Sequence, residues 1–317
     1  MKTSRILLAL AIAFIALLVV TSSRRVRAAS DARSGDWTIR HSDEAGKVDF
    51  SLIENHLGGT SSHQSAWPAS SFAGVDFSKS GRQDVHFTVT RDAGSIECEG
   101  FLDNGEGAGI FHFHPNANYG AAMRSLGFTV DDEKQYAMAL HEVSLEFARQ
   151  MQAEHLTNLD SDKLIAFRIF KVDSTFIDAL RAEGLKVSDS DKLVAFRIHG
   201  VTPQMVGFLH KAGYSPDEDI LIAMRIHGAT PEWIEELKRH GYDHIELEKL
   251  IAFRIHGVSP EFIEKLQGLG YSHPDPDQLV AMRIHNVTPE YISEMKSRGI
   301  HDLSVDQLVN MRIHGID

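Results

Sequence analysis

Hydrophobic and polar residues alternate with a period of two from Trp37 to about His114. This alternation is typical of antiparallel strands that bury one face and expose the other. The clearest runs have apolar side chains at every second position: Val48, Phe50 and Leu52; Val85, Phe87 and Val89; Phe111 and Phe113. Turn sequences separate such runs, as at residues 92–94 and 103–105. We predict five to seven short strands in a β-meander or small sandwich over residues 35–130, with the Gly- and Ser-rich residues 58–71 as a loop.

From about Tyr136 the apolar positions adopt a helical period and the sequence repeats itself. An arginine recurs every 28 or 29 residues within the same surroundings: Arg168, Arg197, Arg225, Arg254, Arg283 and Arg312. A degenerate earlier copy covers residues 136–156, with Ala139 in the place of the arginine, and a half copy stands at the end. Such self-similarity is the signature of a repeat array. Residues 136–317 are therefore predicted to be helical repeats.

Each unit reads as two short antiparallel helices. Thr230-Pro231 and Ser259-Pro260 place an N-cap before a proline at the first helical position of the second helix. Glycines at Gly200, Gly228 and Gly257 are expected to end the first helix in a left-handed conformation. An acid near the start of each first helix is expected to cap it: Asp162, Asp191, Asp219, Glu248, Asp277 and Asp306. Stacked units of this kind form an α-solenoid, so the chain is predicted to be an α+β protein with a β-meander or sandwich followed by a solenoid.

The N-terminus predicts export. Lys2 and Arg5 precede an apolar run at residues 6–20, and small residues follow, which is the pattern of a signal peptide at residues 1–28. The run is short for a membrane span, which needs about 20 residues. Three arginines after the run would resist translocation, so an uncleaved anchor at residues 6–20 is the alternative. We expect a periplasmic or secreted protein whose only membrane contact would be that anchor.

Composition narrows the function. The net charge is −12, and residues 1–28 carry five basic residues and no acid, so the remainder is more acidic still. This excludes nucleic acid as an expected partner, because phosphate binding needs clustered Lys and Arg. Cys98 is the single cysteine, which excludes an intramolecular disulfide. The sequence has no Gly-x-Ser-x-Gly elbow, and His141-Glu142 lacks the second histidine of a zinc-peptidase helix. We therefore predict a protein without catalytic residues or cofactor.

The repeated arginine lies on the apolar side of its helix, three residues after Ile222 in the case of Arg225. A charge in that place must be paired or bonded to backbone carbonyls. The acids seven residues further on, as Glu232 after Arg225 and Glu261 after Arg254, are plausible partners. Thr175 and Gln204 stand there in the first two full units, so these acids cannot be the only partners. We predict a buried structural ladder, with a ligand-gripping ladder as the alternative.

A histidine also recurs in five units: His199, His227, His256, His285 and His314. Units about 10 Å apart cannot place two of them on one zinc ion, and a histidine in the last turn is favoured by the helix dipole. We predict a structural role, with a shared response to acid pH as the alternative.

The predicted strands hold one candidate metal site. His112 and His114 alternate with phenylalanines and project from one strand face, where His86 or Glu99 could supply a further ligand. A metal site or an enzyme site here remains an alternative to a purely structural role.

The second helices differ most between units at their ends. The basic residues of these variable positions, Lys238, Arg239, Lys296 and Arg298, are candidates for binding a partner. A constant core with a varied surface is what an extended recognition face needs. We expect an envelope protein or peptide as the partner.

The repeated Arg-Ile-His-Gly-Val-Thr-Pro-Glu unit with Gly-Tyr resembles repeats at the extracytoplasmic C-terminus of bacterial membrane metallopeptidases of the β-lactam-sensor and antirepressor type. Residues 91–94, 99–100 and 105–113 resemble the β-rich segment before those repeats. The resemblance implies a free-standing sensor-side module. The membrane helices and zinc helix of the family have no counterpart, so peptidase activity is not implied.

Together these observations predict an exported, non-catalytic binding or scaffolding module that recognises a protein or peptide through its repeats. The alternatives are a regulatory sensor of ligand, pH or metal that partners a membrane protein, and an enzyme with its site near His112 and His114.

Overall fold

The structure is a computed structural model that describes residues 33–56 and 59–316. The predicted signal peptide lies outside the described residues and stays a prediction. Within these residues, no helix is both long and apolar enough to span a membrane.

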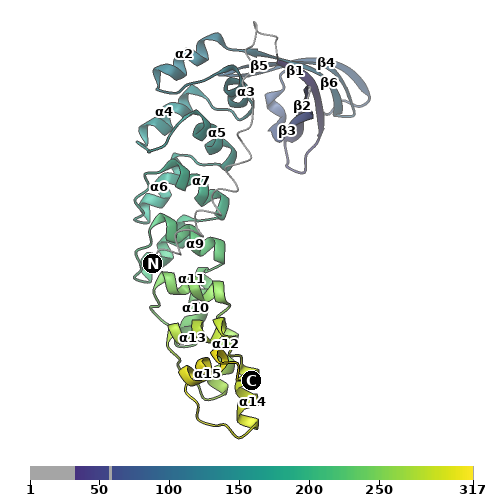
Figure 1. Cartoon of the computed structure of the whole chain (residues 1–317). Helices are drawn as coiled ribbons and strands as arrows, with labels where there is room; N and C mark the ends of the chain where they lie inside the picture. The colour runs from purple at the N-terminus through teal and green to yellow at the C-terminus, as the bar shows by residue number, and fades with distance from the viewer. Residues whose placement is uncertain (1–32, 57–58, 317) are drawn as a thin grey trace.

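The N-terminal part is one antiparallel sheet of six strands in the order β3-β2-β1-β6-β5-β4 (Figure 1). The strands are β1 Arg33–His41, β2 Lys47–His56, β3 Gly59–Pro68, β4 Arg82–Arg91, β5 Gly94–Asp103 and β6 Glu106–Pro115. Two three-stranded meanders thus meet where β1 pairs with β6. The predicted β-meander is confirmed as a single sheet.

The predicted loop at residues 58–71 is wrong, because Gly59–Pro68 form strand β3. This strand pairs along its whole length with β2 and lies at the edge of the sheet. Its side chains are mostly exposed, and Trp67 is the buried one. Backbone pairing needs no apolar side chains, so a polar, Ser-rich sequence can form an edge strand that carries little hydrophobic signal.

The sheet curls around an aromatic core. Phe50 on β2 and Phe87 on β4 have ring centroids 6.4 Å apart, although three strands lie between them in the sheet. Phe72 contacts both rings at 5.2 and 5.4 Å. Trp37 lies against the glycines of β5 and β6, where a β-carbon at Gly109 would come within 2.6 Å of the indole nitrogen. Glycine is therefore required at this position for the tryptophan to reach the core.

The hairpin turn expected at residues 103–105 is confirmed. Asn104 and Gly105 have φ of 53° and 84° between the paired residues Asp103 and Glu106. A two-residue turn with both φ angles positive matches the twist of the adjoining strands. The glycine-rich segment that follows is strand β6.

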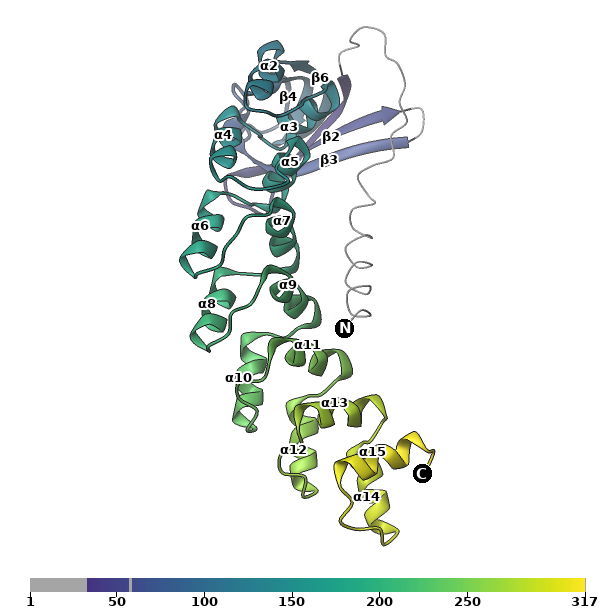
Figure 2. The ribbon, with the colours of Figure 1, turned by 60° about the vertical axis from the view of Figure 1, so that its left-hand side comes forward.

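The predicted repeats are confirmed as two layers of stacked helices (Figures 1 and 2). The first helices are α3 Asp132–Leu140, α5 Ser161–Phe170, α7 Ser190–His199, α9 Glu218–His227, α11 Leu247–His256, α13 Pro276–Ile284 and α15 Val305–Ile313. The second helices are α4 Leu145–Ala153, α6 Ser174–Ala182, α8 Pro203–Lys211, α10 Pro231–Arg239, α12 Pro260–Gly268 and α14 Pro289–Ser297, and α2 Ala117–Ser125 packs on α4. First helices contact first helices and second helices contact second helices along the array.

The helix ends follow the predicted chemistry with one exception. Thr230 and Ser259 cap α10 and α12, and each is followed by a proline at the start of the helix. Gly200, Gly228 and Gly257 have φ of 73–74° at the ends of α7, α9 and α11. These caps are confirmed.

The exception concerns the acids near the start of the first helices. The N-caps stand two residues earlier, as Asp160 before α5 and Asp189 before α7. Asp162 and Asp191 lie inside the first turn, where they pair with Lys134 at 2.9 Å and Lys163 at 2.7 Å of the preceding unit. The predicted capping role is therefore wrong for these acids, because each helix begins earlier than expected and its second residue faces the neighbouring unit.

Sheet and array share one hydrophobic core. Tyr136 of α3 is 4% exposed and packs on Phe111 and Phe113 of β6, with ring centroids 6.4 and 5.0 Å apart. Gln135 donates hydrogen bonds to the carbonyls of Ala93 and Asn116. The first repeat thus closes the open end of the curled sheet, and the sheet projects sideways from one end of the array (Figure 1).

Candidate functional site

The repeated arginine connects each first helix to the unit before it. Arg225, Arg254 and Arg283 donate Nε hydrogen bonds of 3.1–3.2 Å to the carbonyls of His199, His227 and His256. These carbonyls end the preceding first helix and would otherwise lack a partner. The repeated histidine therefore stabilises the contact between units through its backbone carbonyl, while its side chain faces outward.

The guanidinium groups also stack on the preceding second helix. Arg254 lies over the ring of Trp233 at 5.1 Å and Arg283 over that of Phe262 at 5.0 Å. Arg168, Arg197 and Arg312 lie in the same way over Phe147, Phe176 and Tyr291. Arg168, Arg254 and Arg283 thus join two units through both a carbonyl and an aromatic face.

The predicted burial of this ladder is wrong. All six arginines are half-buried or exposed. The acids seven residues further on are not their hydrogen-bond partners, and the ion pair of the ladder in the described residues is that of Arg168 with Glu142, at 3.1 Å. A carbonyl and a ring satisfy a guanidinium without the cost of burying two charges, which explains why the expected acid is not needed.

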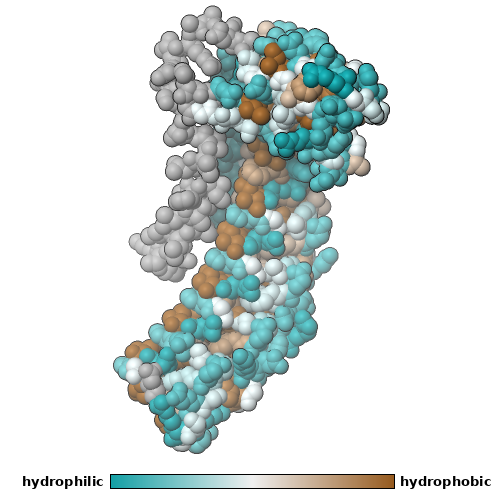
Figure 3. Space-filling view, turned by 90° about the vertical axis from the view of Figure 1, so that its right-hand side faces the viewer, coloured by the Kyte–Doolittle hydropathy of each residue, from teal (hydrophilic) through white to brown (hydrophobic). Residues whose placement is uncertain are grey.

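The residue after each arginine is an exposed isoleucine. We call this set the isoleucine edge: Ile169, Ile198, Ile226, Ile255, Ile284 and Ile313, each between 36% and 54% exposed. Figure 3 shows hydrophobic side chains in a row along the array, on the side toward which the sheet projects. Isolated exposed isoleucines need no explanation, but a row that recurs in six units is a regular apolar feature of the surface.

Sequence reasoning missed the isoleucine edge although the signal was present. Ile255 follows buried Phe253 by two residues, which places it about 200° around the helix from the core. Ile226 stands in the same relation to buried Met224. An apolar residue repeated on the solvent side of a helix has no packing role, so its position in the helical wheel could have identified it.

The histidines of the repeats and of the sheet do not form a metal site. No group of three or more His, Cys, Asp or Glu side chains within residues 33–56 and 59–316 is arranged to hold a metal ion. On the outer face of the sheet, His86 and His114 each hydrogen-bond to the Glu97 carboxylate, at 2.8 and 3.0 Å. These hydrogen bonds hold the pKa of Glu97 below its ordinary value. His112 is opposite Glu97 in the register, on the predicted face, but the acid that gathers the histidines is Glu97 and not Glu99.

The predicted partner-binding residues have different surroundings. Lys296 is half-buried and donates to the carbonyl of Leu269 at 2.7 Å, which makes it a contact between second helices. Lys238 and Arg298 are about half exposed and pair with acids of their own units, Asp243 at 3.4 Å and Glu294 at 2.5 Å. Arg239 is exposed. Three of the four candidates thus remain at the surface, on the layer opposite to the isoleucine edge.

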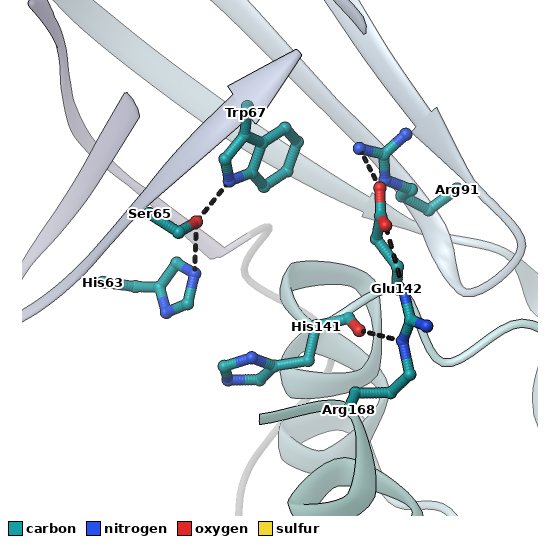
Figure 4. A network of polar contacts seen from close by, with 7 residues as sticks. All are labelled: His63, Ser65, Trp67, Arg91, His141, Glu142 and Arg168. Carbon is teal, nitrogen blue, oxygen red and sulfur yellow. Dashed lines mark hydrogen bonds and ion pairs between the residues drawn. The ribbon is translucent and has the colours of Figure 1, made fainter. Parts of the chain in front are cut away.

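A polar network joins the sheet to the array (Figure 4). Glu142 follows the end of α3, and its carboxylate forms an ion pair with Arg91 of β4 at 2.5 Å and accepts a hydrogen bond from Arg168 of α5 at 3.1 Å. It has a φ of 54°, in the left-handed region that costs a side chain about 1–2 kcal/mol. Glycine has the same place in later units, such as Gly228. The Glu142 carboxylate thus links Arg91 of the sheet to Arg168 of the array.

Two histidines meet beside this network. The rings of His63 on β3 and His141 at the end of α3 are perpendicular, with centroids 4.8 Å apart (Figure 4). The pKa of His141 is lowered to about 4. Burial of the ring is the largest cause, and the neighbouring His63 and Arg168 add to it. Burial also lowers the pKa of His63. Both rings are thus held neutral at neutral pH.

Cys98 lies in the core of the sheet, and burial raises the pKa of its thiol. Burial therefore disfavours the reactive thiolate form of Cys98.

Comparisons of this chain with protein-family models, with curated proteins and with solved structures each give no match. The resemblance of the repeats to the C-terminal part of sensor-type metallopeptidases therefore stays a prediction.

Proposed function

We propose that this protein is a non-catalytic binding module that holds a protein or peptide partner along the isoleucine edge. The observation that carries the proposal is the recurrence of one exposed isoleucine in each of six stacked units. Water-exposed apolar side chains in a regular row contribute binding energy when a partner covers them, at about 25 cal/mol per Å². A solenoid supplies the same contact at each unit, so weak contacts add along its length.

The sheet has a separate part in the proposal. It is fixed to the first unit by a shared core and by the bridge of Arg91, Glu142 and Arg168. It projects on the side of the first helices, which carry the isoleucine edge (Figure 1). A rigid projection at one end would set where a bound partner begins. We further propose that the protein is exported and that its partner is an envelope protein or peptide.

The proposal is tested by removing the apolar row without changing the fold. Ile226→Ser, Ile255→Ser and Ile284→Ser are combined in one variant, and Lys238→Glu with Arg239→Glu forms the control on the opposite layer. Partners captured from an envelope extract by each protein are compared quantitatively by mass spectrometry. We expect the isoleucine variant to lose a partner by at least about tenfold, equivalent to 1.4 kcal/mol, while the control retains it.

Equal capture by the isoleucine variant and the unchanged protein would contradict the proposal. Loss in the charge variant alone would transfer the binding surface to the second helices. Melting curves of both variants check that neither result comes from unfolding.

The regulatory alternative keeps one specific observation in its favour, the His63 and His141 pair between sheet and array. Protonation would place two charges in contact there. A sensor that responds to pH would therefore change the attachment of the sheet as the pH falls.

A further inference from the structure

The outer face of the sheet carries a hollow that shares no residue with the isoleucine edge. Its volume is about 800 Å³, and it lies across β1, β6, β5 and β4, which are adjacent in the sheet. Its apolar side chains are those of Phe101, Ala108 and Ile110. Ala108 is opposite Phe101 in the register, and its single methyl group leaves the surface low beside the ring. Ile110 is 44% exposed, so this hollow presents an apolar centre to the solvent.

Carboxylates from three strands line the same hollow: Asp36, Asp84 and Glu99. Asp36 and Glu99 stand on either side of Ile110 in the register of the sheet. Asp84 is opposite Phe101 in the same way. Among the described residues, no lysine or arginine lines the hollow. The apolar centre is therefore flanked by negative charge that the lining itself does not neutralise.

These carboxylates do not converge on a metal ion. Neighbouring strands lie about 4.8 Å apart, so Asp36 and Glu99 start from strands about 10 Å apart. The oxygen ligands of a calcium ion lie about 2.3–2.6 Å from it. No group of three or more His, Cys, Asp or Glu in the described part of the chain could hold a metal ion. The charge of the hollow therefore suits separate cationic groups.

Arg82 shows which cation this surface accepts. Its guanidinium lies over the ring of Phe101, 4.0 Å from the centroid, and its Nε is 3.8 Å from a carboxylate oxygen of Asp84. A guanidinium in this place gains from both the aromatic face and the carboxylate. Arg82 is at the end of β4, and it leaves Ile110 and the two carboxylates beside it uncovered. A further arginine or lysine would find the same kind of surroundings there.

We infer that this hollow binds a basic segment of a partner polypeptide, in which arginine or lysine side chains accompany apolar ones. The cationic groups pair with Asp36 and Glu99 while an apolar side chain covers Ile110. One small cation cannot meet two carboxylates on strands about 10 Å apart, whereas a polypeptide segment carries several charges. Exposed ion pairs are individually weak, so the apolar contact is needed as well. This second surface does not depend on the isoleucine edge.

The test is the binding of a short fluorescent peptide of alternating arginine and leucine, measured by fluorescence anisotropy. Asp36→Asn with Glu99→Gln removes two charges of the hollow and keeps the side-chain shapes. Glu235→Gln with Glu264→Gln, on the exposed surface of α10 and α12, is the control with the same net charge. We expect the Kd to rise about three- to tenfold for the hollow variant and to stay within about twofold for the control. Ile110→Ser keeps every charge and should raise the Kd about threefold.

Equal weakening by the two charge variants would overturn the inference, because the peptide would then follow the net charge of −12 and not the hollow. A peptide of alternating arginine and serine that bound as tightly would overturn it as well, since the apolar centre would not be used. So would arginine amide that bound as tightly as the peptide, because the ligand would then be a small cation. The substituted side chains are exposed, so melting curves of all variants should match that of the unchanged protein.

The same peptide is also measured with the variant that carries Ile226→Ser, Ile255→Ser and Ile284→Ser. We expect unchanged binding, since the two surfaces are separate. Loss of the peptide in this variant alone would transfer it to the isoleucine edge and overturn the inference, while the proposed function would stand.

Discussion

Two inner repeats are joined by an arginine that contacts a carbonyl and an aromatic ring of the preceding unit. The same arginine contacts occur beside the sheet, with one residue changed. In the array, Arg254 bonds to the carbonyl of His227, stacks on Trp233 and packs against Gly228. At the sheet, Arg168 bonds to the carbonyl of His141 and lies over Phe147 in the same way.

The change is at the residue in the left-handed position. Gly228 lets the guanidinium approach closely, since a β-carbon there would lie 2.9 Å from it. Glu142 has the equivalent place at the sheet and adds a carboxylate that reaches Arg91. A glutamate in the place of glycine therefore adds an ion pair between the first repeat and the sheet.

The largest effect is expected where the two regions share their core. Tyr136→Ala would leave a cavity against Phe111 and Phe113 and should lower the free energy of unfolding by about 3–5 kcal/mol. Urea denaturation measures the loss. Tyr136→Phe keeps the ring and should lower the free energy of unfolding by only about 1 kcal/mol, for the lost hydrogen bond between the Tyr136 hydroxyl and Glu54. Equal losses for the two variants would contradict a packing role.

Changing the contact between two inner repeats should lower the free energy of unfolding by a smaller amount. Gly257→Ala introduces a β-carbon at a φ of 73° and within 2.9 Å of the Arg283 guanidinium, so we expect a loss of about 2 kcal/mol. The opposite change is available at Lys171, which has the same place in its unit with a φ of 58°. Lys171→Gly should stabilise the protein by about 1 kcal/mol, since it relieves backbone strain. A stabilising Gly257→Ala would show that the guanidinium does not need this approach.

The connection to the sheet should differ from the inner ones in its dependence on pH. The pKa of His141 is lowered to about 4 in the folded protein, from 6.5 when exposed, so between these values the folded state binds fewer protons than the unfolded state. Stability should therefore be constant above about pH 6.5 and decrease as the pH falls toward 4. We expect about 1–2 kcal/mol, after discounting the shift for partial exposure and screening.

His141→Gln is the matched variant, because it retains every other titrating group near the pair: His63, Arg91, Asp92, Glu142 and Arg168. Urea denaturation across this pH range should give a shallower slope for the variant. If the free energy of unfolding depended on pH in the same way in both proteins, the histidine pair would not be the cause of the pH dependence.

The smallest effect is expected for a single arginine of the ladder. Arg254→Ala removes one carbonyl hydrogen bond and one stacking contact from a half-exposed side chain, for about 1–2 kcal/mol. A buried ion pair would have cost about 3–5 kcal/mol. Arg239→Ala, on the exposed surface of α10, should remain within about 0.5 kcal/mol. A loss as large as that of a buried pair would restore the original expectation of burial.

The sequence predicted the elements that repeat and failed where a contact was made between distant segments. Thr230, Ser259 and the glycines ending the first helices have local reasons for their positions, and local reasons are visible in sequence. Strand β3 was missed because an edge strand is defined by its neighbour rather than by its own polar residues. The sequence left open whether Arg254 meets an acid or a carbonyl, because only the fold brings the carbonyl of His227 to it.

The ion pair between the sheet and the first repeat could not be predicted either, because it also joins distant segments. Glu142 departs from the repeat pattern where glycine is expected, but only the fold brings Arg91 to it across 51 residues. The isoleucine edge could have been predicted, since Ile255 lies on the side of its helix opposite to Phe253. It was overlooked because an isoleucine in a helix is ordinarily assigned to the core.

Site-specific photo-crosslinking tests the central claim most directly. A photoreactive phenylalanine analogue is placed at Ile255 in one protein and at Arg239 in another, and each is irradiated with an envelope extract. The account predicts a discrete crosslinked partner from position 255 that is lost when Ile226 and Ile284 are replaced by serine, and none from position 239. A partner crosslinked from position 239 alone would contradict it, since binding would then belong to the second helices.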